Sequence, residues 1–367
     1  MATRVLFDEQ TFLMQERGGI SRYFTELICQ FDGQPSLGVA PLVPARWVKN
    51  EHLALAFPER HHIPPGPLRR RPLLKLANRA FASGSGAADL VHHTHYDERY
   101  LGRYRGIPRV CTVYDMIPEL MPEAFPLGNP HQAKKRFVQE CDAIICISET
   151  TKRDLQAVYA VGDKPVVVTN LAVSDQFRPR GSQRMSLPDQ YVLFIGQRSG
   201  YKNASVLLRS MASLVSSHRD LWLVLVGGGS LTQSEQAEAA TLGLTNRLVQ
   251  LHVPDADLPD VYAGAAAFVF PSRYEGVGLP VLEAFASGAP TLLADTEIFR
   301  EVAGAESAFF DPDNHEQLAG LIARCLTDPV YRRELASSGS RRLAEYSWER
   351  TAQQTSLVYQ QLLSGAS

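Results

Sequence analysis

Two glutamates with the chemistry to bind a sugar lie eight positions apart in PSRYEGVGLPVLEAFASGAP, residues 271–290. The run before them, AAAFVF, predicts a buried strand, RYEGVG predicts a loop, and LPVLEAFASG predicts a helix that begins near Pro280. Glu275 then lies on the loop and Glu283 about one turn into the helix. Carboxylates bind vicinal diols, and the free amides of a helix start suit a phosphate. The pattern indicates a site for a sugar nucleotide; the simpler alternative is a solvated loop residue and a partner of the helix dipole.

Two cations follow another predicted strand. In GQRSGYKN, Arg198 and Lys202 lie on the loop between the apolar run YVLFIG and the next helix. A planar arginine fork and a lysine point charge there suit a diphosphate, whereas two merely exposed cations are the simpler alternative. Gly18 and Gly19 also precede a helix, which allows close approach to an anion or only a tight turn. The segment is not G-x-G-x-x-G, which argues against a dinucleotide site.

The elements that would position these residues follow an α/β pattern. Apolar strands such as RVLF and AIICIS alternate with helices such as ISRYFTELICQF, and the pattern restarts after the polar linker 174–190. Such alternation predicts parallel sheets covered by helices on both faces, which bind ligands at the carboxyl ends of their strands. We predict two Rossmann-like domains, 1–176 and 177–346, that face each other across a cleft. A last helix, capped by Ser347, follows them.

Composition excludes several classes of protein. The 367 residues carry a formal net charge of −2, which argues against a dedicated nucleic-acid binder. Five scattered cysteines without a C-x-x-C motif predict buried free thiols in a reducing compartment. The N-terminus enters a strand directly instead of a secretory signal, and no apolar run is long enough to span a bilayer. We expect a cytoplasmic protein.

One segment departs from the even distribution of charge. GPLRRRPLLKLANRA, residues 66–80, contains no acidic residue, and its leucines could form an apolar stripe. Either this basic amphipathic element rests on an anionic membrane or holds an anionic acceptor, or it is a solvated helix face. Its basic residues are Arg69, Arg70, Arg71, Lys75 and Arg79.

Three short motifs resemble metal sites but have simpler interpretations. HHTHY places His92, His93 and His95 at a strand end, where two of them could share a metal with a carboxylate, although packing is the favoured explanation. The Asp-x-Asp pairs at 255–257 and 311–313 precede helices, where aspartate caps N-termini. We expect no metal and no cofactor.

The segment FVFPSRYEGVGLPVLEAFASGAPTLLADTEIFREVAGAESAFFDPDN resembles the signature of glycosyltransferase family 4, retaining enzymes of the GT-B fold. FIGQRSGYKN is similar to the family's phosphate loop and ERGGISRYF to its glycine-rich first loop. YSWERTAQQ resembles its closing helix, which in the family crosses back to the first domain. The similarity covers almost the whole chain and is weaker over 45–90. It implies that residues 347–367 pack on an N-terminal acceptor domain and that 177–346 bind the donor.

The resemblance also implies roles for single residues. Glu275 would contact the donor sugar and Glu283 the ribose, while Arg198 and Lys202 would hold the diphosphate. Gly19 would approach the phosphates or the sugar. Backbone amides would come from Gly276, Val277, Gly278 and Leu279.

One strand end, TVYDMIP, departs from the family pattern. Many members carry a histidine before the aspartate, near the transferred sugar, whereas this chain has Tyr114 followed by Asp115. Either Tyr114 substitutes as a hydroxyl donor, or Asp115 or His95 serves the sugar. Glu275, Asp115 and Tyr114 are therefore the catalytic candidates.

The resemblance implies a hexosyltransferase with a nucleotide-sugar donor and a glycan or lipid-linked glycan acceptor. We expect it to be metal-independent, because Arg198, Lys202 and the helix-start amides would stabilise the leaving diphosphate. The basic segment 66–80 favours a peripheral contact with the inner face of the membrane. GGISRYF and GYKN look like members that build bacterial surface polysaccharides such as the lipopolysaccharide O-antigen, often as mannosyltransferases. This favours GDP-mannose over UDP- or dTDP-sugars. The alternatives are a sugar-nucleotide epimerase or hydrolase on the same fold and a catalytically silent nucleotide-sugar-binding protein. A nicotinamide-dependent dehydrogenase ranks below both.

Overall fold

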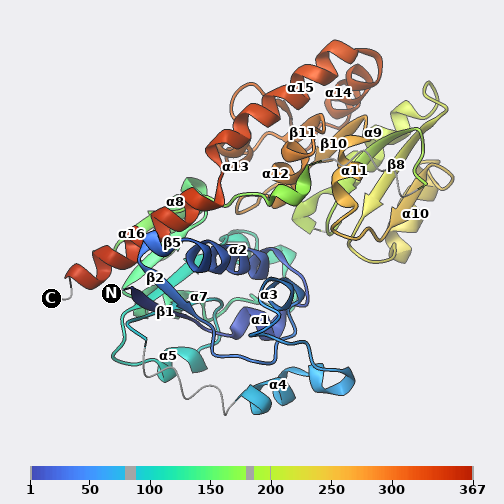
Figure 1. Ribbon diagram of the computed structural model, residues 1–367. Coiled ribbons are helices and arrows are strands. Elements are labelled where there is room, and N and C mark those ends of the chain that lie inside the picture. The colour runs from blue at the N-terminus through green and yellow to red at the C-terminus, as the bar shows by residue number, and fades with distance from the viewer. Residues whose placement is uncertain (1, 79–87, 179–185, 199, 366–367) are drawn as a thin grey trace. The chain divides into compact units, whose positions relative to one another are not determined.

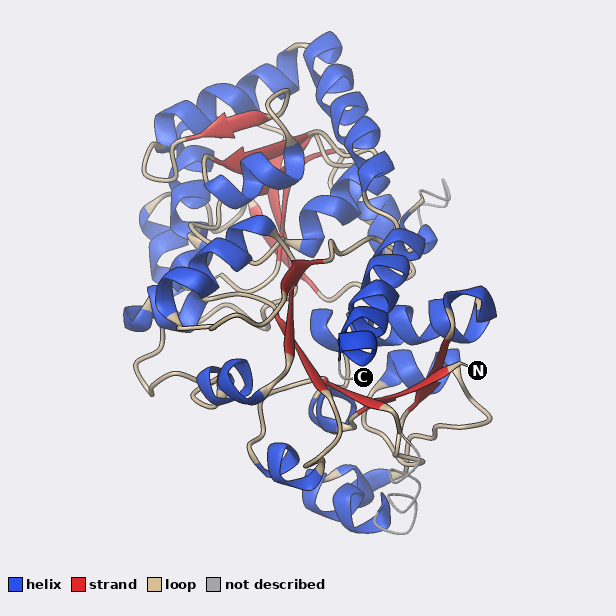
Figure 2. Cartoon of the chain, turned by 90° about the vertical axis from the view of Figure 1, so that its left-hand side faces the viewer, coloured by secondary structure: helices blue, strands red, loops and turns tan. Residues whose placement is uncertain are grey.

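The computed structural model describes residues 2–78, 88–178, 186–198 and 200–365. Contacts between residues divide the chain into unit 1, Met1–Leu171 with Ser347–Ser367, and unit 2, Ala172–Tyr346. Each unit contains one six-stranded parallel sheet with helices on both faces (Figure 1, Figure 2). This is the predicted α/β class. Part of the predicted linker, 179–185, and the end of the basic segment, including Arg79, lie outside the described residues.

The sheet of unit 1 has the strand order β2-β1-β3-β4-β5-β6, and all neighbours run parallel. Strands β3 and β5 are buried along their whole length, as expected for a sheet covered on both faces, although β3 ends in two histidines. The order reverses between β1 and β3, so the loops that follow these two strands lie next to each other. The strands are β1 Thr3–Phe7, β2 Val39–Leu42, β3 Leu90–His93, β4 Arg109–Val113, β5 Ala143–Cys146 and β6 Val166–Val168.

The helices of unit 1 follow the apolar spacing of the sequence. In α2, Phe24, Leu27, Ile28 and Phe31 recur at helical spacing and are all buried. Ser148 caps α8, since its hydroxyl accepts from the amide of Thr151 at 3.0 Å. The helices before α16 are α1 Gln10–Met14, α2 Gly19–Gly33, α3 Glu51–Ala56, α4 Arg71–Asn78, α5 Arg99–Arg103, α6 Ile117–Leu120, α7 Lys134–Glu140 and α8 Glu149–Val158.

The last helix, α16 (Trp348–Gly365), belongs to unit 1 although unit 2 precedes it in the chain. Its N-terminal amides are capped by Ser347, whose hydroxyl accepts from the amide of Arg350 at 3.2 Å. Its apolar face packs on α2. The hydroxyl of the buried Tyr359 lies 2.6 Å from Nδ1 of His92 on β3, which ties α16 to the core of the sheet.

The sheet of unit 2 has the order β12-β11-β10-β7-β8-β9. Counted from its own first strand, this is 3-2-1-4-5-6, the order of dinucleotide-binding Rossmann domains. The order reverses between β7 and β10, which pair through Phe268 and Leu193. The strands are β7 Gln190–Ile195, β8 Leu221–Val226, β9 Leu248–Leu251, β10 Ala267–Phe270, β11 Thr291–Ala294 and β12 Ala308–Phe310.

The helices of unit 2 carry clear capping signals. Asp328 accepts from the amides of Val330 and Tyr331, each at 3.0 Å, and so starts α15. Gly288 follows α12 with a φ of +70°, as expected of the glycine that ends a helix. The helices are α9 Ala204–Leu214, α10 Gln233–Thr241, α11 Leu258–Ala263, α12 Leu279–Ala286, α13 Glu297–Ala303, α14 His315–Thr327 and α15 Pro329–Arg342.

All five cysteines are free thiols, and four of them are buried. None of the helices in the described part of the chain is both long and apolar enough to span a bilayer.

Candidate functional site

The loops after β7 and β10 form the candidate site of unit 2. Because these strands are parallel neighbours where the strand order reverses, their carboxyl ends open a crevice at which such sheets bind ligands. The first loop runs from Gly196 to Asn203 and the second from Pro271 to Gly278. Both loops contain residues that the sequence predicts to bind a donor.

Hydrogen bonds join the two loops. The amide of Arg273 donates to the carbonyl of Tyr201 at 2.8 Å. The side chain of Asn203 donates to the carbonyl of Pro271 at 3.3 Å and to that of Pro312 at 2.7 Å. Asn203 has a φ of 55°, the only positive value among the non-glycine residues that the structure describes. Strained backbone of this kind persists where surrounding contacts hold it, which is typical of binding loops.

Lys202 and Glu275 meet between these loops. Nζ of Lys202 lies 2.5 Å from Oε1 of Glu275, and both side chains are mostly buried, at 18% and 10% exposure. The lysine also lies 5.1 Å from the ring centroid of Tyr201 and 5.7 Å from that of Phe270. The structure therefore brings together two residues that the sequence places 73 positions apart. One cation and one carboxylate, held against aromatic rings, can receive a phosphate and a sugar hydroxyl side by side.

Glu283 occupies a buried position one turn into α12. Its Oε2 accepts from the hydroxyl of Tyr262 on α11 at 3.0 Å. The helix begins after Gly278, whose φ is +81° and whose missing side chain leaves room for Phe270 and Phe299. A Cβ at Gly278 would lie 3.0 Å from Phe270 and 3.2 Å from Phe299. Glycine is thus needed here both for its backbone angle and for the space it leaves.

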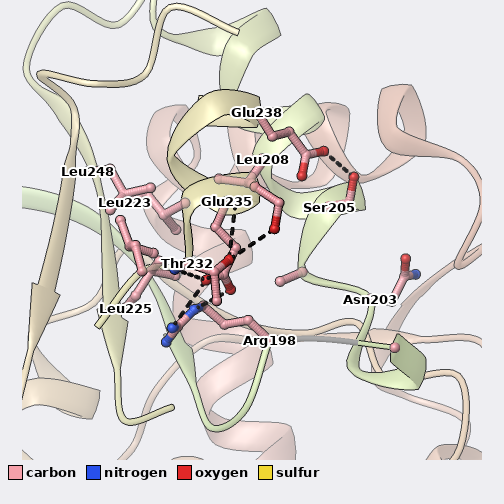
Figure 3. A pocket seen from close by; sticks show the side chains of 14 residues that line it. Arg198, Asn203, Ser205, Leu208, Leu223, Leu225, Thr232, Glu235, Glu238 and Leu248 are labelled. Carbon is pink, nitrogen blue, oxygen red and sulfur yellow. Dashed lines mark hydrogen bonds and ion pairs between the residues drawn. The ribbon is translucent and has the colours of Figure 1, made fainter. Parts of the chain in front are cut away.

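Arg198 has many partners within unit 2 (Figure 3). Its Nε donates to Glu235 at 2.7 Å, and its terminal nitrogens donate to the carbonyls of residues 227–230 at 2.8–3.2 Å. The side chain is only 5% exposed. Arg198 therefore holds the glycine-rich turn after β8 in place. The diphosphate contact predicted for it stays a prediction, and a ligand that took the guanidinium would have to replace some of these bonds.

A cavity of about 350 Å³ lies next to Arg198, between α9, α10 and the ends of β8 and β9. Figure 3 shows the apolar side chains of Leu223, Leu225 and Leu248 on one side of it. On the other side, Ser205 donates to Glu238, and Glu235 completes a capping box with Thr232. The polar groups of this cavity thus bind one another in the structure.

Unit 1 contains the remaining predicted site residues. Gly19 is the first residue of α2, and nearby the amide of Ser21 donates to the side chain of Gln15 at 3.1 Å. The hydroxyl of Tyr114 donates to the carbonyl of Thr94 at 3.1 Å, and its ring packs in the core. Burial raises the pKa of Tyr114 well above its usual range, so the group remains a phenol. Its contribution to a sugar contact stays a prediction.

Asp115 follows β4 and is backed by a buried lysine. Its Oδ1 accepts from the amide of Ile117 at 3.0 Å. Nζ of Lys134 donates to the carbonyl of Asp115 and to Glu119, each at 2.8 Å, and lies 3.8 Å from Oδ1 of Asp115. This lysine joins the strand end to Glu119 on α6.

The basic segment is partly neutralised in the fold. Arg71 and Lys75 both form ion pairs with Asp97, at 3.1 and 3.4 Å. Arg69 donates from Nε to the carbonyl of Pro64. The stripe expected for this segment is also exposed in part, at Leu68, Leu73 and Leu76.

The metal-like motifs have other partners. Nδ1 of His93 lies 2.7 Å from Asp8, and His92 is held between Tyr359 and Thr112. Asp313 pairs with Arg273. Within the part of the chain that the structure describes, no group of three or more His, Cys, Asp or Glu side chains is arranged to hold a metal ion.

Two family models match consecutive parts of the chain. "Glycosyltransferase Family 4" matches residues 17–176 and "Glycosyl transferases group 1" matches residues 176–342. The chain belongs to glycosyltransferase family 4. The boundary between the two matches falls where unit 1 passes into unit 2, and the second match contains every predicted donor residue except Gly19.

Relatives of known name come from several bacteria. "O-antigen chain mannosyltransferase B" of Escherichia coli is 28% identical over 312 residues, which are 80% of this chain and 82% of that protein. "Serotype-specific mannosyltransferase WbdA" of Escherichia coli is 28% identical over 303 residues, and there the match spans 75% of this chain but only 37% of the larger protein. A "D-inositol 3-phosphate glycosyltransferase" of Thermobispora bispora is 28% identical over 308 residues, 76% of this chain and 72% of that protein.

Solved structures show the same fold. Sucrose-phosphate synthase from Thermosynechococcus elongatus superposes with a TM-score of 0.75 at 18% identity, over 99% of this chain and 100% of that one. Anabaena HepE in complex with UDP and glucose gives a TM-score of 0.74 at 18% identity, over 98% and 100%. These glycosyltransferase neighbours and the two Rossmann-like units identify the GT-B fold.

Several residues of the site were not predicted from the sequence. Asn203 links the two loops, Tyr262 holds Glu283, and Glu235 holds Arg198. The position of Asn203 directly before a helix is a signal only for an N-terminal cap, but its side chain does not cap α9 and donates to the carbonyls of Pro271 and Pro312 instead. Tyr262 and Glu235 gave none, since each acts on a residue far from it in the sequence.

Proposed function

We propose that the protein is a retaining mannosyltransferase that transfers mannose from GDP-mannose to a glycan or lipid-linked glycan acceptor during the synthesis of a surface polysaccharide. The observation that carries this proposal is the contact between Lys202 and Glu275 where the strand order of unit 2 reverses. The choice of mannose rests on similarity to the O-antigen mannosyltransferase of Escherichia coli. Nucleotide binding is supported by the UDP and glucose bound to a protein of the same fold.

In this proposal Lys202 binds the diphosphate together with the amides of Gly276, Val277, Gly278 and Leu279 at the start of α12. Glu275 accepts from hydroxyls of the sugar, and Glu283 accepts from hydroxyls of the ribose. Gly19 in unit 1 allows the backbone to approach the donor. Arg198 holds the turn after β8, and it would bind the diphosphate once the ligand replaces some of its hydrogen bonds to Glu235 and to that turn.

The chemical step breaks the bond between the anomeric carbon and the diphosphate oxygen through an oxocarbenium-like state. Negative charge grows on the departing diphosphate, where Lys202 and the helix-start amides stabilise it without a metal ion. The acceptor oxygen forms the new bond on the same face, and its proton passes to the leaving phosphate. Asp115 would orient the sugar from unit 1, and Tyr114 would act on the fold through its hydrogen bond to the carbonyl of Thr94.

Two alternatives use the same donor site. An epimerase or hydrolase would bind the sugar nucleotide and need no sugar acceptor. A catalytically silent protein would bind the nucleotide without turnover. The relatives named as transferases favour transfer over both.

The test begins with nucleotide binding. A ligand that binds only the folded protein raises its melting temperature, so GDP, UDP, dTDP, ADP and NAD are compared, then GDP-mannose. We expect a shift with GDP and GDP-mannose, and mannose transfer to a lipid-linked glycan. A shift with UDP or dTDP alone would show that the donor is a UDP- or dTDP-sugar and not GDP-mannose. Binding without transfer to any acceptor, in folded protein, would favour the silent alternative.

A further inference from the structure

A second cavity lies in unit 1, beneath the basic helix α4. It measures about 690 Å³ and is bounded by α4, α5 and Glu9, which lies between β1 and α1. The residues that line it include three cations and one carboxylate, with an exposed leucine at the rim: Lys75, Arg99, Arg103, Glu9 and Leu76. It lies in the other unit from the donor residues Lys202, Glu275 and Glu283.

Cations outnumber carboxylates around this cavity. Asp97 alone receives three of them, Arg71 at 3.1 Å, Lys75 at 3.4 Å and Arg99 at 2.6 Å. The hydrogen bond from Arg99 is the largest of the effects that lower the pKa of Asp97 to about 2. One carboxylate cannot neutralise three cations, so the cluster keeps an excess of positive charge.

The crowding of positive charges affects the pKa of Lys75. Burial lowers its pKa, and the neighbouring Arg71 and Arg99 lower it further, against the opposing effect of Asp97. Nε of Arg71 is buried and has no hydrogen-bond partner among the described residues. A phosphate in the cavity would relieve this repulsion, because its oxygens accept several charge-assisted hydrogen bonds at once.

Glu9 does not cancel the remaining charge. Its Oε1 accepts from Arg103 and from the hydroxyl of Tyr100, each at 3.0 Å, while its Oε2 is buried and has no partner among the described residues. Burial raises the pKa of Glu9 despite the nearby Arg103. Among the cations that the structure describes, Glu9 therefore pairs with Arg103 alone, and Arg71, Lys75 and Arg99 share the single carboxylate of Asp97.

Exposed leucines lie on the same segment as Lys75. Leu76 is 60% exposed at the rim, and Leu68 and Leu73 are 50% and 39% exposed along the segment before it. A ligand with an anionic group in the cavity and an apolar chain outside it would contact both the cations and the exposed leucines. A free phosphate would leave the leucines in water, so the apolar stripe favours an amphiphile over a soluble anion.

We propose that the cavity lined by Lys75, Arg99 and Arg103 binds the phosphoryl group of a lipid, whose apolar chain lies against the exposed Leu68, Leu73 and Leu76. The inference rests on the proposed function in one respect, that the bound lipid is the one that carries the glycan acceptor. It goes beyond a membrane contact of α4, because it assigns a site that includes α5 and Glu9.

The test measures binding of the full chain to vesicles of phosphatidylcholine with and without phosphatidic acid. The site variant is Lys75→Gln with Arg99→Gln, which leaves Asp97 paired with Arg71. The charge-matched control is Lys152→Gln with Arg153→Gln on α8, which packs on β5 and β6. A cation near an anionic surface contributes about fivefold to affinity, so we expect a loss of about thirtyfold in the site variant and little in the control.

A second pair of measurements separates a lipid from a soluble anion. Saturating GDP is present throughout, so that the donor site is filled. Under these conditions inorganic pyrophosphate should compete with the vesicles, and Leu73→Ser with Leu76→Ser should weaken vesicle binding while pyrophosphate binding persists. Equal losses of vesicle affinity in the site and control variants would show that diffuse surface charge, and not this cavity, causes the binding. Pyrophosphate binding without any vesicle binding, or binding of neither, would overturn the proposal.

The donor is tested separately in the same variants. GDP should still raise the melting temperature of Lys75→Gln with Arg99→Gln, because Lys202 and Glu275 lie in the other unit. Failure of GDP binding in the wild type would refute the proposed function. Vesicle binding that survives that failure would leave the lipid site standing.

Discussion

The ammonium of Lys202 and the carboxylate of Glu275 lie 2.5 Å apart at the switch point of unit 2. In the free protein each charge is neutralised by the other. In the proposed function, a diphosphate that draws the lysine away would free the glutamate for a sugar hydroxyl. The pair would then couple the arrival of the phosphates to the exposure of the sugar-binding group.

This coupling predicts opposite results for the two partners. Lys202→Gln removes a charged hydrogen bond to the diphosphate, worth about 1.5–3 kcal/mol, and should weaken GDP binding about 10- to 100-fold. Glu275→Gln should leave GDP affinity unchanged or higher, because the lysine is released, while kcat for transfer falls. Calorimetry with GDP and a transfer assay measure the two effects. Arg209→Gln on α9 is the control, and equal GDP losses in Lys202→Gln and Arg209→Gln would contradict the assignment.

The turn before α12 gives a prediction with a built-in comparison. Gly278 and Gly288 both have positive φ, +81° and +70°, but only a Cβ at Gly278 would crowd neighbours, at 3.0 and 3.2 Å. Gly288→Ala should cost about 1–2 kcal/mol of unfolding free energy from backbone strain alone. Gly278→Ala should cost more and should also weaken GDP binding, because it moves the amides at the helix start.

Chemical denaturation and GDP titration of the two alanine variants provide the measurement. Matching stabilities and matching affinities would show that the start of α12 is not a constrained part of the donor site.

The sequence predicted the buried strands and the strand-end residues better than it predicted their partners. Long apolar runs such as β7 and β8 were recognisable because fully buried parallel strands are apolar throughout. The edge strands β2 (VAPL) and β12 (AFF) were not anticipated, since four and three residues carry too weak a pattern. Short edge strands form because a neighbouring strand supplies the hydrogen bonds, and that neighbour is distant in the sequence.

The same limit applies to the candidate site. Lys202 and Glu275 were each placed at a strand end, but their contact depends on β7 and β10 becoming neighbours. The basic segment was identified as free of acidic residues, yet Asp97 reaches it from the loop after β3. The net charge of a segment in the sequence does not give its net charge in the fold, because a residue distant in the sequence can supply the counter-ion.

Tyr114 offers a test of whether its hydroxyl serves the fold or the sugar. In the structure the hydroxyl donates to the carbonyl of Thr94. Tyr114→Phe should therefore cost about 1 kcal/mol in the free energy of unfolding, the usual worth of such a bond, and leave kcat within a few-fold of the wild type. A large fall in kcat with an unchanged melting temperature would instead establish the sugar contact predicted from the sequence. Asp115→Asn, assayed beside it, should lower kcat, as expected of a group that orients the sugar.

The stability of the protein should fall in acid because of His92. Burial lowers the pKa of this imidazole from 6.5 to about 3, where Thr112 and Tyr359 hold it as the neutral form. Between these two pH values the unfolded chain binds a proton that the folded chain does not, so stability decreases as the pH falls. The slope is about 1.4 kcal/mol per pH unit for each such histidine, and His95, with a pKa near 4, adds to it over part of the window. Calorimetry from pH 7 to pH 4 should show a shallower decline for His92→Gln than for the wild type or for His218→Gln, and parallel curves for all three would refute this explanation.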